Sequence, residues 1–222
     1  MLTREFRSLL ETEAHKAGMA LPRAGLDSIE AHYRLLVKWS RAVRLVGDLD
    51  PLAVVRRHVL ESLALLPYIQ ERRGSLLDIG SGNGFPAIPL KCMLPDLRLG
   101  MMEPTLRKSL FLSTVVQELG LADCEVIRAR VDRPQDLARM GRWDCITMRA
   151  VAVIPAVMAG GAPALRPGGR ILFMVGEAGR VEILRHLKHP LELIASNQMP
   201  SSRAAYIVAV WTPSTTAPGT IH

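Results

Sequence analysis

LLDIGSGNGFPAIPL, residues 76–90, decides the fold of this chain. An apolar run closes on Asp78, three glycines follow at every second position, and Pro86 and Pro89 come shortly after the last of them, Gly84. Proline fits only the first turn of a helix, and closely spaced glycines allow a tight turn. The stretch therefore predicts a strand, a glycine turn and a helix that begins just beyond Gly84.

The chain after this stretch alternates between strand-like runs and segments long enough for helices, such as 105–119 and 152–165. The strand-like runs are SLLDI (75–79), LRLGMME (97–103), CEVIRA (124–129), WDCITM (143–148) and GRILFMV (169–175). This alternation predicts an α/β fold with a parallel sheet covered on both faces. Two further runs, LELIASNQ (191–198) and AAYIVAVW (204–211), have no helix between them, so we expect the sheet to end in an antiparallel pair.

Helices are expected before the first strand, at about residues 2–17, 23–43 and 51–67. In the third of these, Asp50 can cap the helix and Pro51 fits its first position. With 222 residues, 49% of them hydrophobic, the chain can bury one sizeable core. We divide it into an N-terminal helical extension, a sheet domain, and a tail that lacks apolar residues to bury and is expected to be flexible: 1–73, 74–211 and 212–222.

Charge and cysteine content limit the partners. The first residues interleave charged and apolar groups, so we expect no signal peptide, no membrane span and a cytoplasmic monomer. A net charge of +7 favours a polyanionic partner, and the densest basic stretch, residues 128–149, fits an RNA-binding face or a solvated mixed-charge face equally well. Cys92, Cys124 and Cys145 lack the spacing of a metal site, so we expect reduced thiols in the core and no metal.

The glycine turn is the expected ligand site, because ligands of open parallel sheets bind beyond the carboxyl ends of the strands. A dinucleotide fold would continue its glycine pattern where this chain has Phe85, and no Lys followed by Ser or Thr closes a P-loop. Glycines after an aspartate instead favour S-adenosylmethionine. Pro86 and Pro89 remove two amide donors from the helix start, so we expect loop amides between Gly80 and Gly84 to hold its carboxylate. A turn without a ligand is the alternative.

Two carboxylates follow the next strand-like runs. Glu103 ends the second run and can accept hydrogen bonds from both ribose hydroxyls of such a cofactor. A helix-capping role beside Pro104 and Thr105 is the alternative. Asp132 follows the third run and can lie near the adenine amino group, and a surface acid is an equally good interpretation.

Several motifs together resemble the glucose-inhibited division protein B family, bacterial methyltransferases that act on the N7 atom of one guanine in 16S ribosomal RNA. The resemblance runs from about Ala31 to Val210. Its most specific part is DIGSGNGFPAIPL, where Phe-Pro and a second Pro follow the glycines. Further matches are Trp39, Arg57-His58 followed by Glu61-Ser62, Arg107-Lys108 with Phe111-Leu112, and Arg149-Ala150.

The resemblance implies a seven-stranded class I methyltransferase fold, S-adenosylmethionine as cofactor, and 16S RNA or the small ribosomal subunit as substrate. Guanine N7 carries an exposed lone pair, so we expect no general base. Arg149 is expected to position the substrate, with a structural salt bridge as the alternative, and His58 is a second candidate, with packing or capping as the alternative. The cofactor-binding residues are expected to be Asp78, Gly80, Ser81, Gly82, Gly84, Phe85, Glu103, Val131, Asp132 and Arg149.

Aromatic residues near the loop are candidates for stacking on a base that leaves its RNA stack. Phe85 and Trp39 are the nearest, with core packing as the alternative for Trp39. The chain departs from the family pattern at Arg44, Ala87, Met148 and Val175, and Val175 stands where a family lysine could face the RNA. A small-molecule methyltransferase and a non-catalytic cofactor-binding RNA protein are the alternative functions.

Overall fold

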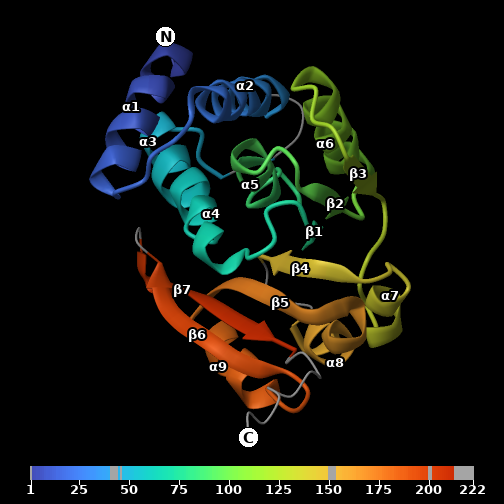
Figure 1. Ribbon diagram of the computed structural model, residues 1–222. Coiled ribbons are helices and arrows are strands. Elements are labelled where there is room, and N and C mark those ends of the chain that lie inside the picture. The colour runs from blue at the N-terminus through green and yellow to red at the C-terminus, as the bar shows by residue number, and fades with distance from the viewer. Residues whose placement is uncertain (1, 41–44, 46, 150–153, 200–201, 213–222) are drawn as a thin grey trace, which may run out of the picture.

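In the computed structural model, residues 2–40, 45, 47–149, 154–199 and 202–212 are described, and they fold around a seven-stranded sheet (Figure 1). The strand order is β3-β2-β1-β4-β5-β7-β6. The strands are β1 Ser75–Ile79, β2 Arg98–Met102, β3 Cys124–Ile127, β4 Trp143–Met148, β5 Leu165–Gly176, β6 Glu192–Met199 and β7 Ser202–Trp211. The first five strands are parallel, and β7 pairs antiparallel with both β5 and β6. The expected antiparallel end of the sheet is thereby confirmed.

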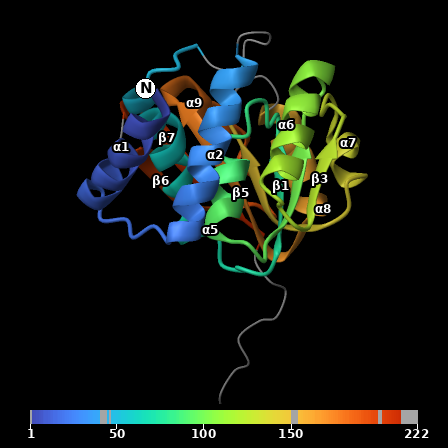
Figure 2. The same cartoon turned by 90° about the horizontal axis from the view of Figure 1, so that it is seen from above.

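The helices cover both faces of this sheet. They are α1 Leu2–Lys16, α2 Arg23–Trp39, α3 Pro51–Val54, α4 Glu61–Leu63, α5 Ala87–Met93, α6 Leu106–Glu118, α7 Pro134–Ala138, α8 Ile154–Ala164 and α9 Glu177–His186. Helices α1, α2, α5 and α6 lie on one side, as the view from above shows, and α7, α8 and α9 lie on the other (Figures 1 and 2).

Alternate residues of each strand point to opposite faces, and this builds two separate cores. On β1, Leu76 joins the core shared with α1, α2, α5 and α6, whereas Leu77 joins the core beneath α8 and α9. The N-terminal helices thus share one hydrophobic core with a face of the sheet. The expected boundaries at residues 73 and 74 stay a prediction.

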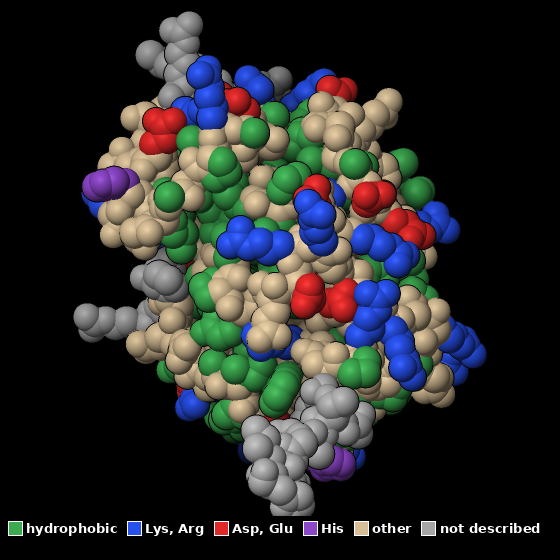
Figure 3. Space-filling model, in the orientation of Figure 1, with side chains coloured by type: hydrophobic (Ala, Val, Ile, Leu, Met, Phe, Trp, Pro, Cys, Tyr) green, Lys and Arg blue, Asp and Glu red, His purple; other side chains and the backbone are tan. Residues whose placement is uncertain are grey.

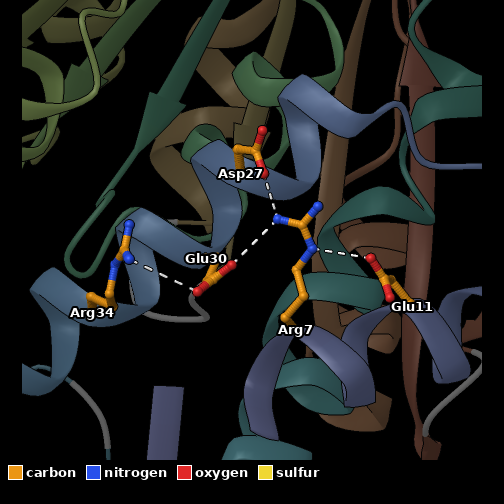
Figure 4. A network of polar contacts seen from close by, with 5 residues as sticks. All are labelled: Arg7, Glu11, Asp27, Glu30 and Arg34. Atoms are coloured by element: carbon orange, nitrogen blue, oxygen red, sulfur yellow. Dashed lines mark hydrogen bonds and ion pairs between the residues drawn. The ribbon is translucent and has the colours of Figure 1, made fainter. Parts of the chain in front are cut away.

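The N-terminal helices are held to each other by a polar network as well as by packing. Arg7 of α1 donates to Glu11 on its own helix, at 3.0 Å, and to Asp27 and Glu30 on α2, and Arg34 lies 3.9 Å from Glu30 (Figure 4). Exposed ion pairs of this kind contribute about 0 to 1 kcal/mol each, so apolar burial on α1 and α2 carries most of the contact.

Two expected helices differ from the structure. The helix predicted at 23–43 ends at Trp39, and residues 41–44 lie outside the described part of the chain. The helix expected at 51–67 is present from Pro51 to Leu63, but it is irregular. Asp50 does cap it, because its carboxylate accepts from the Ala53 amide at 2.8 Å, but the segment passes from α3 through a π-helix at Val55–Leu60 into α4 and a later 3-10 turn. π-helical turns inside α-helices often mark functional positions.

Other expectations concern the surface. No helix in the described ranges is long and apolar enough to cross a membrane. Lys and Arg side chains gather where Figure 1 places β3 and α7, with acidic side chains between them (Figure 3). Arg130 pairs with Asp132 at 2.9 Å and Arg133 with Asp136 at 3.3 Å, so part of this stretch is a mixed-charge face.

The three cysteines differ in burial, and the start of the expected tail is bonded to the sheet. Cys145 is buried, and burial raises the pKa of its thiol to about 12, whereas Cys92 and Cys124 are only half-buried. Thr212 is not part of a free tail, because its amide donates to Gly169 and its carbonyl accepts from Gly168. The rest of the expected tail lies outside the described residues.

Candidate cofactor and substrate site

The site lies where the strand order reverses, between β1 and β4. The register pairs Ile79 with Met148, so the residues that follow them, Gly80 and Arg149, leave neighbouring strand ends together. This reversal point is where open α/β sheets bind ligands. The class of fold therefore places the glycine loop and Arg149 at one edge.

The three glycines of the loop all have positive φ, at 74° for Gly80, 52° for Gly82 and 88° for Gly84. A side chain at any of them would strain the backbone. The surroundings differ, however. A Cβ at Gly84 would meet Ile88 at 2.7 Å, whereas a Cβ at Gly80 or Gly82 would meet nothing closer than 3.7 Å. Gly84 is required for packing, and the other two leave open space beside the loop.

Helix α5 begins as the prolines predict. Pro86 is its N-cap residue, and Pro89 lies within its first turn. The loop amides, however, mostly donate inward. Those of Gly80 and Ser81 both donate to the Met102 carbonyl at 2.9 Å, and that of Gly84 donates to the Ser81 carbonyl at 2.7 Å. The expectation that these amides are open for a carboxylate is wrong for all three, because they fix the turn itself.

Glu103 faces the same loop. Its side chain is buried, one carboxylate oxygen accepts from the Gly82 amide at 3.0 Å, and the other accepts from the Thr105 amide at 2.8 Å. Both interpretations of Glu103 are thus compatible with the structure. The bond to the Thr105 amide, just ahead of α6, fits the capping role, and the position beside the open space at Gly82 fits ribose binding.

Asp78 is a buried carboxylate at the end of β1. One oxygen accepts from the Thr147 hydroxyl at 2.7 Å, and the other, Oδ2, has no hydrogen-bond partner among the residues that the structure describes. Burial raises the pKa of this carboxyl to about 6. A carboxylate oxygen left without a donor is costly in an interior, and such a group at a strand end is typical of a ligand site.

Three rings pack against one another at Phe85 of the loop. Phe85 is buried between His32 of α2, with ring centroids 4.9 Å apart, and His58 of the π-helix, at 5.0 Å. The His32 Nε2–H donates to the Asn83 carbonyl at 2.9 Å. Phe85 is therefore packed rather than open to a base, which corrects the expectation that it stacks on the RNA.

Both histidines beside Phe85 are held neutral. Burial lowers the pKa of each to about 4, and for His58 the nearby Arg149 guanidinium lowers it further. His32 was missed by the sequence reasoning. Its only signal is its place on the apolar stripe of α2, where a lone histidine does not distinguish itself from a core residue.

Arg149 is bound to the N-terminal helices. Its Nη2 lies 2.7 Å from the Glu61 carboxylate and 2.6 Å from the Arg57 carbonyl, and its Nη1 donates to His58 Nδ1 at 3.1 Å. The salt bridge is partly buried, with 28% of the Arg149 side chain and 6% of the Glu61 side chain exposed. The salt-bridge alternative for Arg149 is thus present in the structure. The sequence did not reveal Glu61 as its partner.

The same groups line a hollow of about 650 Å³, to which Arg57, His58, Glu61 and Arg149 all contribute. This size is within the usual range for small-ligand pockets. A salt bridge on the wall of a pocket can bind a ligand as well as hold the fold, so the two interpretations of Arg149 are compatible.

The remaining candidates are partly core residues and partly surface residues. Val131 is buried in the core beneath α8, and Asp132 is exposed and paired with Arg130. Trp39 is half-buried and lies edge-on to Phe111 at 5.7 Å, as its packing alternative expects. Val175 is also buried, in the core next to α9, so a residue at this position does not face the hollow.

The other departures from the family pattern involve core positions. Met148 and Ala87 are both fully buried. Arg44 lies outside the described residues. In the described ranges, no group of three or more His, Cys, Asp or Glu side chains could hold a metal ion.

The residues present fit S-adenosylmethionine. Open space at Gly80 and Gly82 admits a ligand against the backbone, Glu103 borders that space with a buried carboxylate, and Asp78 Oδ2 lacks a donor that a ligand could supply. Together these residues can bind the cofactor.

Comparisons with known proteins agree with this fold. A Geobacter metallireducens precorrin-6y C5,15-methyltransferase structure matches with a TM-score of 0.57 at 14% identity, over 77% of this chain and 92% of that chain. The fibrillarin/Nop5p complex matches with a TM-score of 0.60 at 15% identity, over 78% and 90%. The fold and site define a class I S-adenosylmethionine-dependent methyltransferase.

The sequence places the chain more closely. The family model for GidB, rRNA small subunit methyltransferase G, matches residues 26–205. The Desulfitobacterium hafniense (strain Y51) ribosomal RNA small subunit methyltransferase G is 36% identical over 154 residues, 69% of this chain and 64% of that protein. The Mycolicibacterium smegmatis protein of the same name is 39% identical, over 72% of this chain and 68% of its own length. The chain belongs to the rRNA small subunit methyltransferase G family.

Proposed function

We propose that this chain transfers the methyl group of S-adenosylmethionine to N7 of a guanine in 16S ribosomal RNA. The observation that carries the proposal is the juxtaposition of the glycine loop, open at Gly80 and Gly82, with Arg149 at the neighbouring strand end. Family membership supplies the substrate class.

Methyl transfer to N7 requires no proton transfer by the protein. When bound, S-adenosylmethionine supplies an electrophilic methyl: the N7 lone pair forms the new N–C bond, the S–C bond breaks, and sulfur keeps that electron pair. Guanine N7 carries no proton, so no base must remove one. The chain instead has to hold the two reactants at contact distance, which can lower the barrier by several kcal/mol.

The chain's own groups divide this work. Glu103 accepts from the ribose hydroxyls in place of, or in addition to, its present Gly82 contact. Arg149 directs guanidinium donors at the guanine or at a flanking phosphate, an arrangement that Arg favours over Lys. His58, neutral and stacked on Phe85, keeps Arg149 in place without adding a second positive charge next to the developing charge on the purine.

The structure bears on both alternative functions. A small-molecule methyltransferase needs a closed apolar pocket, whereas the hollow here is lined by Arg57, His58, Glu61 and Arg149. A cofactor-binding protein without turnover was suggested by Val175, whose burial in the core removes that argument.

The test uses tritium transfer from labelled S-adenosylmethionine to purified small subunits, to protein-free 16S RNA, and to a pool of small metabolites. We expect label in the RNA, with subunits and free RNA compared at equal 16S concentration to learn which is preferred. Label in the metabolite pool alone would support the small-molecule alternative, and cofactor binding with no label anywhere would support the non-catalytic one.

We propose that the protein acts in the cytoplasm, which is consistent with a ribosomal RNA substrate, and that it acts as a monomer. Cell fractionation and light scattering of the purified protein test these two statements.

A further inference from the structure

We infer that His32 is a positioning residue for the cofactor: from α2 it holds the backbone of the glycine loop in the shape that S-adenosylmethionine binds. The inference deepens the proposed function, because it rests on this loop being the cofactor site. It starts from the carbonyl of Asn83, the loop residue between Gly82 and Gly84, which accepts from the His32 Nε2–H at 2.9 Å.

Two elements hold this part of the loop. From the sheet, the Glu103 carboxylate at the end of β2 accepts from the Gly82 amide at 3.0 Å. From the N-terminal helices, His32 donates to the next residue, Asn83. Gly82 and Gly84 both have positive φ, but glycine enters and leaves that region at little cost. The hydrogen bonds around the loop, rather than local backbone preference, therefore select its shape.

The His32 ring is in direct contact with the loop backbone. A Cβ at Gly84 would lie 3.2 Å from His32 Nε2. The side chain is fully buried, and its ring centroid lies 4.9 Å from that of Phe85 and 6.1 Å from that of Phe111. The donor nitrogen is thus enclosed between the loop and the core, and its position is fixed before a cofactor binds.

The second ring nitrogen of His32 argues against a role in packing alone. Because Nε2 carries the hydrogen, Nδ1 carries a lone pair, and it has no partner among the residues that the structure describes. A buried polar atom without a partner costs stability, so an apolar side chain would serve simple packing better. Such a cost persists where function uses the group, and the contact to the loop supplies that function.

Asn83 contacts the N-terminal part of the chain a second time. Its side-chain amide donates to the Leu45 carbonyl at 3.1 Å. Backbone and side chain of this one loop residue are therefore both bonded to residues that precede β1. The N-terminal extension thus forms part of the cofactor site, and His32 is the side chain through which α2 contributes to it.

The experiment separates the donor from the packing of the ring. His32→Phe keeps a ring and removes the donor. His32→Gln restores a donor, because the glutamine Nε2 can take the place of the imidazole Nε2, but it packs worse in an apolar site. Val115→Ala, fully buried on α6 in the same core, is the control for lost packing. Affinity for S-adenosylmethionine is measured by calorimetry, and stability by urea unfolding without cofactor.

We expect His32→Phe to weaken cofactor binding about five- to tenfold, the range for one net hydrogen bond. Its urea midpoint should not fall, because removing the unpaired Nδ1 offsets the donor lost at Asn83. His32→Gln should bind cofactor more tightly than His32→Phe although it unfolds at lower urea. Val115→Ala should lower the midpoint and keep cofactor affinity within about twofold of wild type.

The rate of methyl transfer gives an independent readout. At saturating cofactor, single-turnover transfer from His32→Phe to RNA should be within about twofold of wild type, because a residue that positions only the cofactor loop affects binding and not the bound reactants. At cofactor concentrations below the dissociation constant, the rate should fall in proportion to the lost affinity.

Equal cofactor affinity in wild type and His32→Phe would overturn the inference. So would a His32→Gln variant that binds no more tightly than His32→Phe, since affinity would then follow packing. If Phe is too large for the protein to fold, His32→Leu, closer to histidine in volume, takes its place in the same comparison. Wild-type affinity in Gly82→Val would instead remove the proposed cofactor site, so the two failures are distinct.

Discussion

Asp78 and Asp144 lie at opposite ends of two neighbouring parallel strands, β1 and β4, and their carboxylates differ in how many hydrogen-bond donors they contact. At the amino end, Asp144 Oδ2 accepts from the Ser75 amide and hydroxyl, both at 2.8 Å, and from Arg166 at 2.9 Å. At the carboxyl end, Asp78 is fully buried, and within the described residues its Oδ2 has no partner.

This difference indicates a structural role for the amino end of the sheet and a ligand-binding role for the carboxyl end. The satisfied carboxylate at the amino end ties β1 to β4 and the start of β5. The carboxyl end combines an unpaired carboxylate oxygen with three positive-φ glycines, features that cost stability and persist at sites where a ligand uses them.

Gly82→Val should have the largest effect, loss of measurable S-adenosylmethionine binding by calorimetry. The side chain would enter the open space beside Glu103 from a backbone with φ 52°. Gly120→Val is the control, because that glycine also has positive φ and open space but lies after α6. It should lose similar stability and keep cofactor affinity. Equal affinity in both variants would remove the loop from the cofactor site.

Arg149→Ala should lower single-turnover methyl transfer to RNA about a hundredfold, the cost of a misplaced reactant, with cofactor affinity nearly unchanged. Lys should restore little, because an ammonium lacks the planar set of donors. Arg166→Ala removes the cation at Asp144 and should leave the rate intact. Full activity in Arg149→Ala would reduce that residue to its salt bridge with Glu61.

Glu103→Ala should weaken cofactor binding by about 1 to 3 kcal/mol, because ribose hydroxyls would lose a charged acceptor. Glu125→Ala, at an exposed position on β3, is the control and should have no effect. If affinity stays constant while the melting temperature falls, the bond to the Thr105 amide is the main role of Glu103.

Asp78→Asn should stabilise the cofactor-free protein at pH 7.5 and weaken its cofactor binding, whereas Asp144→Asn should destabilise it. A pKa raised from 3.8 to about 6 corresponds to roughly 3 kcal/mol at pH above both values. The unpaired amide left by Asn offsets part of this, so the expected gain is about 1 to 2 kcal/mol in urea unfolding.

The pH dependence gives the sign for Asp78. Its folded pKa is above the unfolded value, so the folded state binds more protons between pH 3.8 and 6, and the penalty fades as pH falls through that window. The advantage of Asp78→Asn should therefore shrink toward pH 4. His32 and His58, with pKa values near 4, have the opposite effect on stability. As pH falls below 6.5 they lower the free energy of unfolding of the wild type and of the variant by the same amount. An advantage that is constant with pH would contradict the assigned cause.

The smallest expected effect is that of pH on the chemical step. Single-turnover rates should vary less than about twofold between pH 6.5 and 8.5, because N7 attack needs no base and most unperturbed side chains do not titrate there. The pKa values of Asp78, His32 and His58 also lie below this window. A steep profile in the chemical step would mean that the methyl acceptor is a protonated atom.

Patterns local in the sequence predicted most of the fold. The strands at 75–79 and 143–148 were predicted to the residue, since apolar runs bounded by turns define them, and Pro86 marked the start of α5. The helix expected at 51–67 forms as far as Leu63, but periodicity does not reveal the π-turn inside it. Such a turn depends on tertiary contacts, here those of His58 and Arg57 with Arg149.

The site divides in the same way. The loop glycines, Glu103 and Arg149 lie at strand ends, where sequence order alone predicts their position. His32 and Glu61 come from the N-terminal helices, and only packing brings them to the loop and to Arg149. Loop amides were predicted to face a ligand, yet those of Gly80 and Ser81 share the Met102 carbonyl, a contact that requires knowledge of β2 beside β1.

The central claim is that N7 of a guanine in 16S RNA receives the methyl group. Its most direct measurement is borohydride reduction followed by aniline cleavage of 16S RNA after reaction with S-adenosylmethionine, because N7-methylguanine breaks the chain under this treatment and unmodified guanine does not. We predict enzyme-dependent cleavage at one guanine, absent with Gly82→Val and strongly reduced with Arg149→Ala. Label incorporated into 16S RNA that resists aniline cleavage would contradict the account.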